Sequence, residues 1–402
     1  MRAPTQGRTD RGTAAVELLG ALYPPPLRVR VAVAGGDDVR AAWTAVPSTS
    51  SPRLLLPAVG GAAASRAVRR QLTGHRMRTR VARTGLSLAA GSGALARVPQ
   101  LRVVVEGPAD APSIEDPLRA ALGVEELRLT MPIGPARSNR KPVLQVTDTA
   151  GDVLAFAKVG HNPLTRLLVQ QEGVTLGCLA RVPLQVVRTP RVLATETWAG
   201  FEVLVLEPLD VPARRLTGDP GRRRLVEVVR EVAAIGGRTL VDWRTHPYRT
   251  ELLARIERCG DLAVPLRREL ERTVARLPVA TGCWHGDLNS GNVALLPGEC
   301  PVWDWERFET GVPVGFDLLH HDLHEAITVH GVAPEDAARR LVGTAARTLA
   351  PLGVLPATAD AVARAYLVTL ACRYLVDNQS AAGASLGRVQ EWLLPTLEEV
   401  RP

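Results

Sequence analysis

The segment from Cys283 to His321 has the sequence CWHGDLNSGNVALLPGECPVWDWERFETGVPVGFDLLHH and decides the fold of this 402-residue chain. His285, Asp287 and Asn292 form the pattern H-x-D-x-x-x-x-N, and Asp304 follows Asp287 by 17 residues. The apolar run and Pro-Gly turn after Asn292 predict a hairpin that returns Asp304 to the side of Asn292. An amide oxygen and a carboxylate that converge suit a hard cation such as magnesium. Asp287 is then left to accept a hydroxyl proton.

The stretch HGDLNSGN would also fit an ordinary polar surface turn, because Gly, Asp, Asn and Ser favour turns in any protein. The spacing of the full set nevertheless resembles the catalytic loop and metal-binding motif of protein-kinase-like folds. The HGD form, followed by Asp-Trp-Glu, is similar to the aminoglycoside phosphotransferase and choline kinase family. This resemblance covers about residues 130–402.

The resemblance implies a role for each matching residue. Asp287 corresponds to the catalytic base, and Asn292 and Asp304 correspond to the residues that hold Mg²⁺ on the phosphates of ATP. His285, grouped with the catalytic residues, would brace the loop. Asp317, in the run VGFDLLHH, matches a family position that ties the catalytic loop together, which is a structural role.

A kinase-like site also needs a strand lysine to hold the α and β phosphates and a helix glutamate to orient it. In VLAFAKVG, the two-residue period of a strand places Lys158 on one face with Leu154 and Phe156. Downstream, Asn162 and Pro163 predict a helix start, and Glu172 then shares a face with apolar residues at four-residue steps. Pairing would offset the cost of burying either charge alone. The alternative is a snorkelling lysine and a partly exposed acid.

The remaining nucleotide contacts are predicted from two segments. The loop IGPARSNRKP lies where the family has its phosphate-covering loop, with Ser138, Asn139 and neighbouring basic residues as candidate phosphate contacts. It contains a single glycine, so an exposed basic turn is an equal alternative. The run FEVLVLEPLD is predicted to be the last strand of the small lobe and the hinge. Backbone near Leu206 to Leu209, including Glu207, is the expected adenine contact.

Composition restricts the class of protein. Hydrophobic residues make up 46% of the chain, which is enough for sizeable cores. No run approaches 18 apolar residues and the first dozen residues lack an apolar signal core, so we expect a cytoplasmic protein without a transmembrane segment. The five cysteines are scattered, which favours neither a disulfide framework nor a zinc site.

The net charge of +8 is concentrated near the N-terminus. Residues 1–130 hold 18 arginines and 10 acids, and the region from Arg66 to Arg83 is rich in arginine. It would suit contact with an anionic surface such as a phospholipid, although a solvated basic face is the simpler interpretation. Aromatic residues are not interleaved with the arginines, so nucleic-acid binding is not expected.

The pattern predicts an α+β protein with a two-lobed kinase-like fold, a small β-rich N-lobe and a large helical C-lobe, preceded by a small α/β extension. We expect a disordered tail at 1–14, a basic extension of unknown role at 15–128, the N-lobe at 129–207 and the C-lobe at 208–402. Within the extension, the expected strands are 27–34, 53–57, 76–83 and 101–106, and the expected helices are 62–72 and 113–122. Further expected elements are strands at 143–147 and 153–159 and helices at 163–179, 334–350, 358–377 and 385–399.

These features together predict an ATP-dependent kinase that moves a γ-phosphoryl group to a hydroxyl of a sugar, an antibiotic or a related metabolite. The Arg-rich run at 211–250 and the balanced charge of 331–402 argue against a polycationic acceptor, so we expect a neutral or anionic small molecule. Two alternatives remain, a catalytically silent kinase-like binding module and an anion or lipid-surface binding protein that acts through the Arg-rich extension. His320, His321 and His324 are expected to serve helix packing and not metal binding.

Overall fold

The computed structural model describes residues 6–31, 38–58, 89, 91–92, 94–95, 98–133, 141–212, 215–273, 277–377 and 391–393. The chain divides into two compact units. The first contains residues 1–136, 140–169 and 192–208, and the second contains 137–139, 170–191 and 209–402. Each unit is described by itself below.

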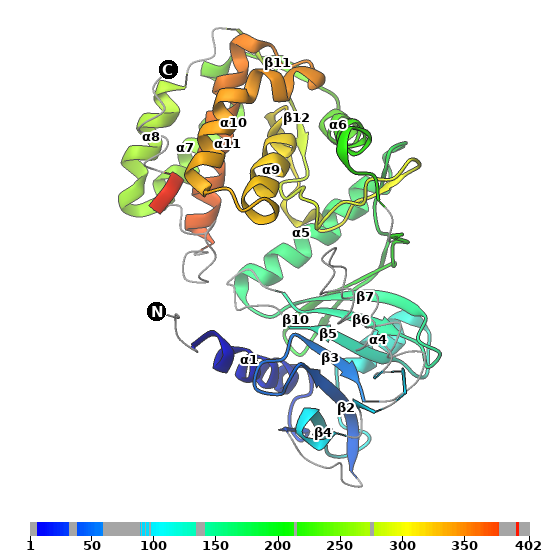
Figure 1. Ribbon diagram of the computed structural model, residues 1–402. Coiled ribbons are helices and arrows are strands. Elements are labelled where there is room, and N and C mark those ends of the chain that lie inside the picture. Colours follow the sequence, from blue (N-terminus) through cyan, green and yellow to red (C-terminus); the bar gives the residue numbers. More distant parts are fainter. Residues whose placement is uncertain are drawn as a thin grey trace. The chain divides into compact units, whose positions relative to one another are not determined.

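The first unit is built on a nine-stranded sheet in the order β1-β4-β2-β3-β5-β6-β7-β10-β9 (Figure 1). Every pairing in it is antiparallel. The strands are β1 (Arg28–Val31), β2 (Val39–Val46), β3 (Leu54–Pro57), β4 (Arg102–Glu106), β5 (Arg128–Pro132), β6 (Val143–Thr147), β7 (Val153–Gly160), β9 (Val192–Trp198) and β10 (Phe201–Leu206).

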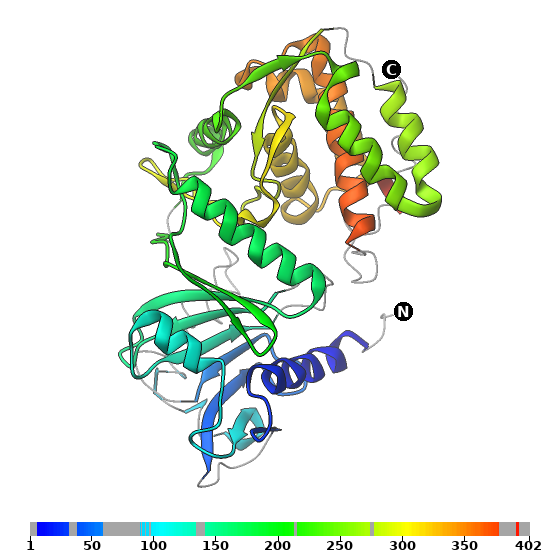
Figure 2. The ribbon, with the colours of Figure 1, turned by 180° about the vertical axis from the view of Figure 1, so that it is seen from behind.

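Two helices, α1 (Gln6–Leu22) and α4 (Glu115–Leu122), pack against this sheet (Figure 2). Leu19 from α1 and Leu118 from α4 are fully buried. They share one apolar cluster with Val105 of β4, Ala157 of β7 and Val205 of β10. The strands before and after residue 128 therefore have a common core and a common sheet.

This shared core differs from the separate α/β extension that the sequence predicted. Strand β3 pairs with β5 through Leu54 with Pro132 and Leu55 with Met131, so the sheet runs across the expected boundary at 128. The antiparallel pairing makes the extension α+β. Helix α1 begins at Gln6, inside the tail expected to be disordered, because its apolar residues from Ala15 onward pack into the core. Strand β2 was not predicted, since its sequence VRAAWTAV is rich in alanine, which has low strand propensity.

Other predicted elements match the structure. Strands β6 and β7 and helix α5 (Pro163–Leu179) lie where the pattern placed them. At the start of α5, the Thr165 N–H donates to Asn162 Oδ1 (2.9 Å) and the Asn162 N–H donates to Thr165 Oγ1 (3.0 Å), a reciprocal cap of the kind that Asn162 predicts. The strand predicted at 76–83 and the helices predicted at 62–72 and 385–399 lie wholly or mostly outside the described residues, as does Arg66 to Arg83.

The second unit is mainly helical. Its principal helices are α6 (Gly218–Ala234), α7 (Pro247–Ile256), α8 (Ala263–Arg272), α9 (Phe316–His324), α10 (Pro334–Leu349) and α11 (Pro356–Val376). A small antiparallel sheet joins β11 (Thr239–Val241), β12 (Val279–Trp284) and β14 (Glu309–Pro313), and β8 (Val187–Arg188) pairs with β13 (Cys300–Pro301). Helix α11 is buried along most of its length and contacts α7, α8, α9 and α10 (Figure 1). It therefore forms the centre of this unit.

The predicted fold class, α+β with a β-rich part and a helical part, is confirmed by these elements and by the two compact units. Within the described residues, no single helix has both the length and the apolar character of a membrane span. The segments Pro334–Leu352 and Pro356–Val376 meet that criterion only when taken together, and they are bent by 114° at their junction.

Candidate active site

The loop that carries the H-x-D-x-x-x-x-N pattern begins where the buried strand β12 ends at Trp284. Asp317, near the start of α9, accepts hydrogen bonds from the backbone N–H groups of His285 (2.7 Å) and Gly286 (3.2 Å). Burial raises the pKa of Asp317 to about 7, although these two hydrogen bonds lower it. Asp317 thus anchors the first residues of the loop to the helical core.

His285 joins the catalytic loop to the following hairpin. Its side chain is fully buried, its Nε2 lies 3.0 Å from the Trp303 carbonyl oxygen, and its Nδ1 accepts from the Asp287 N–H (3.2 Å). Burial lowers the pKa of His285 to about 4, so the imidazole is neutral at pH 7. The described contacts of this ring are with the backbone and with the ring of Trp305, whose centroid is 4.6 Å away. They join the loop to the following hairpin, and the bracing role of His285 stays a prediction.

The lowered pKa of His285 predicts acid lability. The unfolded chain takes up this proton near pH 6.5, whereas the folded chain resists it until about pH 4, so stability falls as the pH drops through this interval. We expect the contribution to be about 3 kcal/mol. Urea unfolding at several pH values should show that His285→Gln, although less stable at pH 7, loses less stability than the native protein between pH 6.5 and 4.

Asp317 makes the opposite contribution to the pH dependence of stability. Its raised pKa makes the folded chain bind more protons than the unfolded chain between about pH 4 and 7, so its contribution to stability increases as the pH falls. Asp317 accepts from the backbone N–H groups of residues 285 and 286, which the substitution His285→Gln retains, so this contribution is expected to persist. The difference between the two pH profiles therefore isolates His285. Parallel profiles would contradict the assignment.

Asp287 is held from two sides. The Asn292 Nδ2 donates to Asp287 Oδ2 (3.1 Å) and to its carbonyl oxygen (2.9 Å), and His320 Nε2 lies 2.9 Å from Asp287 Oδ1. Partial burial would raise the pKa of Asp287, but the hydrogen bond from His320 and the charge of Arg373 outweigh it and hold this pKa well below its ordinary value. The side chain remains 41% exposed. It is therefore an ionised, oriented carboxylate that a ligand can reach.

The predicted hairpin between Asn292 and Asp304 is present. Val293 pairs with Val302 as an antiparallel bridge, and the Trp303 N–H donates to the Asn292 carbonyl oxygen (3.1 Å). Asp304 follows with φ 66° and ψ 51°, a left-handed conformation that is uncommon for residues other than Gly, Asn and Asp.

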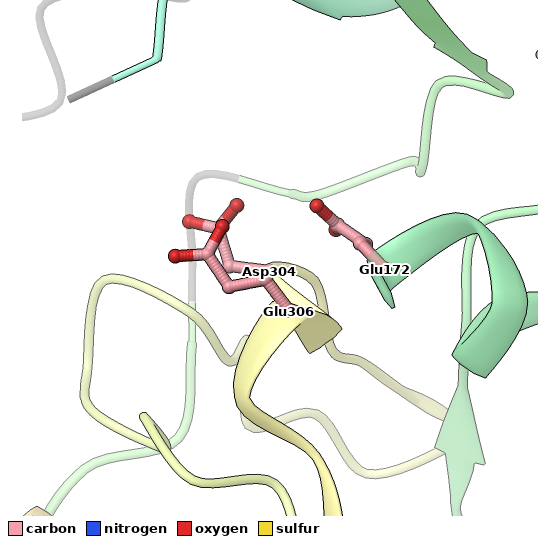
Figure 3. A group of neighbouring side chains, drawn as sticks. All are labelled: Glu172, Asp304 and Glu306. Atoms are coloured by element: carbon pink, nitrogen blue, oxygen red, sulfur yellow. The ribbon is translucent and has the colours of Figure 1, made fainter. Parts of the chain in front are cut away.

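Three carboxylates meet at the end of this hairpin. One carboxylate oxygen from each of Glu172, Asp304 and Glu306 lies within 4.8 Å of the other two. Figure 3 shows the three side chains as neighbours. The Trp305 N–H donates to Glu172 Oε1 (3.2 Å), which joins the middle of α5 to the turn after Asp304. Three negative charges at this distance repel one another unless a cation is present. Carboxylate and amide oxygens are the ligands that suit Mg²⁺.

Gly286 is required by the shape of the loop. Its φ is +88°, and a Cβ atom at this position would lie 2.1 Å from the carbonyl oxygen of Arg307. We expect Gly286→Ala to lower the free energy of unfolding by at least about 3 kcal/mol, from backbone strain together with this clash. Urea denaturation measures the loss.

Gly311 provides a matched control for this substitution. Its φ is also positive, at +72°, but a Cβ atom there would meet nothing within 4 Å. Gly311→Ala should therefore cost only the left-handed strain, about 1 to 2 kcal/mol. Equal losses in the two variants would show that the contact with Arg307 is unimportant.

The other predicted site residues lie in the first unit or outside the described residues. Lys158 is 4% exposed and lies on β7 between Val143 of β6 and Leu204 of β10. Glu207 follows the end of β10 and is half-buried. Ser138 and Asn139 lie outside the described residues. The pairing of Lys158 with Glu172 stays a prediction.

Sequence reasoning missed two site residues. His320 was expected to serve helix packing, but its ring contacts Asp287. It lies three residues after Asp317, so both side chains project from the same side of α9, and this spacing was an available signal. Glu306 was not singled out, although Asp-Trp-Glu places a second carboxylate two residues after Asp304.

The sequence matches no known family model and no curated protein. Similar solved structures include an aminoglycoside phosphotransferase, APH(4)-Ia, in complex with ADP and hygromycin B (15% identity, 72% of this chain, 100% of that chain, TM-score 0.46). Another is a macrolide 2′-phosphotransferase, MphH, from Brachybacterium faecium (17%, 71%, 98%, 0.41). A third is spectinomycin phosphotransferase, APH(9)-Ia, with ADP and spectinomycin (12%, 71%, 96%, 0.39). At these identities no activity passes from those enzymes to this chain.

Proposed function

We propose that this protein is a kinase that transfers the γ-phosphoryl group of ATP to a hydroxyl group of a small molecule. The observation that carries the proposal is the ionised, partly exposed carboxylate of Asp287, held by Asn292, together with the cluster of three carboxylates formed by Glu172, Asp304 and Glu306 in the same unit. In the reaction, the oxygen of the acceptor hydroxyl forms a bond to the γ-phosphorus while the bond from that phosphorus to the ADP oxygen breaks. Asp287 orients the hydroxyl and receives its proton.

Mg²⁺ is the cation that this site would hold. Asn292 and Asp304 would supply its ligands, and Glu172 and Glu306, which lie beside Asp304, would add negative charge. Because the Asn292 Nδ2 donates to Asp287, the amide oxygen is the Asn292 atom directed toward a cation. When bound, the ion offsets the negative charge of the phosphates. The chain's own part is to fix the ligands, through the hairpin hydrogen bonds and the left-handed turn at Asp304.

The remaining nucleotide contacts follow the same proposal. Lys158 contacts the α and β phosphates and Glu172 orients it, while Ser138 and Asn139 cover the phosphates and backbone at Glu207 contacts adenine. Lys158 lies on strand β7 and Glu172 on the helix α5 that follows, which is the order of elements that these roles require.

The surroundings of Asp287 in the second unit favour an acceptor that is neutral or anionic. Arg373 donates a hydrogen bond to the Gly286 carbonyl oxygen, so a guanidinium lies beside the catalytic loop. The side chains that line the small space beside His320, on α9 and α11, are imidazole, phenol and leucine groups with no carboxylate among them: Leu323, His324, Tyr366, Leu370 and Tyr374. Sugars, sugar phosphates and hydroxyl-bearing antibiotics without several amines fit better.

Calorimetric titration of ATP, with and without MgCl₂, tests the nucleotide site first. We expect binding that requires magnesium. An ATP-consumption screen over neutral sugars, sugar phosphates, macrolides and aminoglycosides then tests the acceptor, and we expect turnover with a neutral or anionic compound. Absence of binding at millimolar ATP would overturn the kinase proposal, and turnover with aminoglycosides alone would overturn the acceptor class.

A further inference from the structure

Asp287, His320 and Tyr366 form a hydrogen-bonded chain that runs from the catalytic loop into the interior of the second unit. His320 Nε2 lies 2.9 Å from Asp287 Oδ1, and His320 Nδ1 lies 3.0 Å from the hydroxyl oxygen of Tyr366 on α11. Both inner members are buried, with His320 at 2% and Tyr366 at 0% exposure. From this geometry we infer that His320 is a positioning residue that holds the Asp287 carboxylate for phosphoryl transfer, and that Tyr366 fixes the tautomer of His320. The inference rests on the proposed function.

The hydrogen atoms of this chain can be assigned from its chemistry. An ionised carboxylate only accepts hydrogen bonds, so His320 Nε2 must carry the proton. Burial lowers the pKa of His320, which keeps the ring neutral and leaves Nδ1 as an acceptor. Burial also raises the pKa of Tyr366 well above its ordinary value, so the phenol keeps its proton and donates it to Nδ1. Each link therefore has one donor and one acceptor.

The other charged groups near His320 act in the same direction. Arg373 lies near enough for its charge to disfavour a second proton on the ring, and His324 does the same from one turn along α9, with ring centroids 6.2 Å apart. Asp287 is the group that favours the charged ring, and burial outweighs it. The titratable and charged groups that face the ring from the loop, α9 and α11 are Asp287, His324, Tyr366, Arg373 and Tyr374.

The consequence for Asp287 is a carboxylate fixed at both oxygen atoms. His320 donates to Oδ1 and Asn292 donates to Oδ2, while His285 accepts from the backbone N–H of the same residue. Without His320, Oδ1 loses its donor and the carboxylate can rotate away from the direction in which a hydroxyl must approach. Loss of orientation of a reacting group reduces the rate of the chemical step more than it reduces binding.

Kinetics of four variants test this role. His320→Leu removes the donor, and we expect kcat to fall about tenfold to a hundredfold while KM for ATP stays within about twofold. His320→Gln places an amide N–H near the position of Nε2 and should restore most of kcat. Tyr366→Phe should reduce kcat by a smaller factor. His330→Leu, an exposed histidine beyond α9, is the control and should match the native protein.

A second readout does not need an acceptor. Nitrogen NMR of protein labelled in its histidines, with His320 identified by the signal lost in His320→Gln, should show the neutral Nε2–H tautomer at pH 7. Asp287→Asn and Tyr366→Phe should each shift that signal. An Nδ1–H tautomer or a charged ring would overturn the assignment, and an unchanged kcat in His320→Leu would overturn the positioning role. If the native protein gives this tautomer but no turnover, the proposed function and the kinetic role of His320 both fail, while the hydrogen-bonded chain stands.

Discussion

Asp287→Asn is expected to lower kcat by roughly a hundredfold or more and to leave the affinity for ATP within about twofold. The substitution keeps the size of the side chain but removes the negative charge that accepts the hydroxyl proton. The carboxylate cluster of Glu172, Asp304 and Glu306 does not include Asp287, so we expect the nucleotide site to keep its affinity for ATP. Steady-state kinetics with the acceptor and calorimetry with Mg-ATP measure the two effects separately.

Asp322→Asn supplies the matched control for that prediction. Asp322 lies on α9 in the same unit, and its carboxylate is also ion-paired, with Arg222 at 2.5 Å, but the described contacts do not join it to the catalytic loop. The same chemical change there should leave kcat within about twofold. If Asp287→Asn and Asp322→Asn have equal turnover, Asp287 is not the proton acceptor.

Local spacing predicted the parts of this protein that depend on short-range structure. The cap at Asn162, the buried face of α5 with Glu172, and the hairpin from Asn292 to Asp304 each involve residues fewer than 20 positions apart. A helical or strand period fixes such relations, because it sets which side chains share a face. The loop anchored by Asp317 needed the family resemblance in addition, since 30 residues separate it from Gly286.

Contacts that depend on how elements pack escaped prediction. The alternation of apolar residues within a strand does not determine which other strand it pairs with. The pairing of β3 with β5, which joins the N-terminal strands and strands β5 to β10 in one sheet, was therefore not predicted. The contact of His320 with Asp287 depends in the same way on the packing of α9 beside the loop, and its link to Tyr366 depends on the packing of α11. A buried histidine in a helix can serve either core packing or a functional site. The three-residue spacing from Asp317 was the feature of the sequence that favoured a functional site.

Asp304→Asn should abolish the advantage that magnesium gives to ATP binding. Asn tolerates the left-handed backbone that Asp304 adopts, so the turn should persist, whereas Asp304→Ala adds strain of about 1 to 2 kcal/mol. Loss of the anionic ligand should weaken Mg-ATP binding by at least about tenfold. Glu299→Ala, at an exposed position on the same hairpin, is the control and should bind Mg-ATP like the native protein.

ATP binding measured without magnesium distinguishes loss of a metal ligand from disruption of the fold. In the absence of the ion, the carboxylates of Glu172, Asp304 and Glu306 repel the phosphates of ATP, and removal of one negative charge reduces that repulsion. Metal-free ATP should therefore bind Asp304→Asn as well as, or better than, the native protein. A general disruption of the fold would weaken binding in both conditions, whereas loss of a metal ligand weakens it only when magnesium is present. Equal Mg-ATP affinity in Asp304→Asn and the native protein would exclude Asp304 as a ligand.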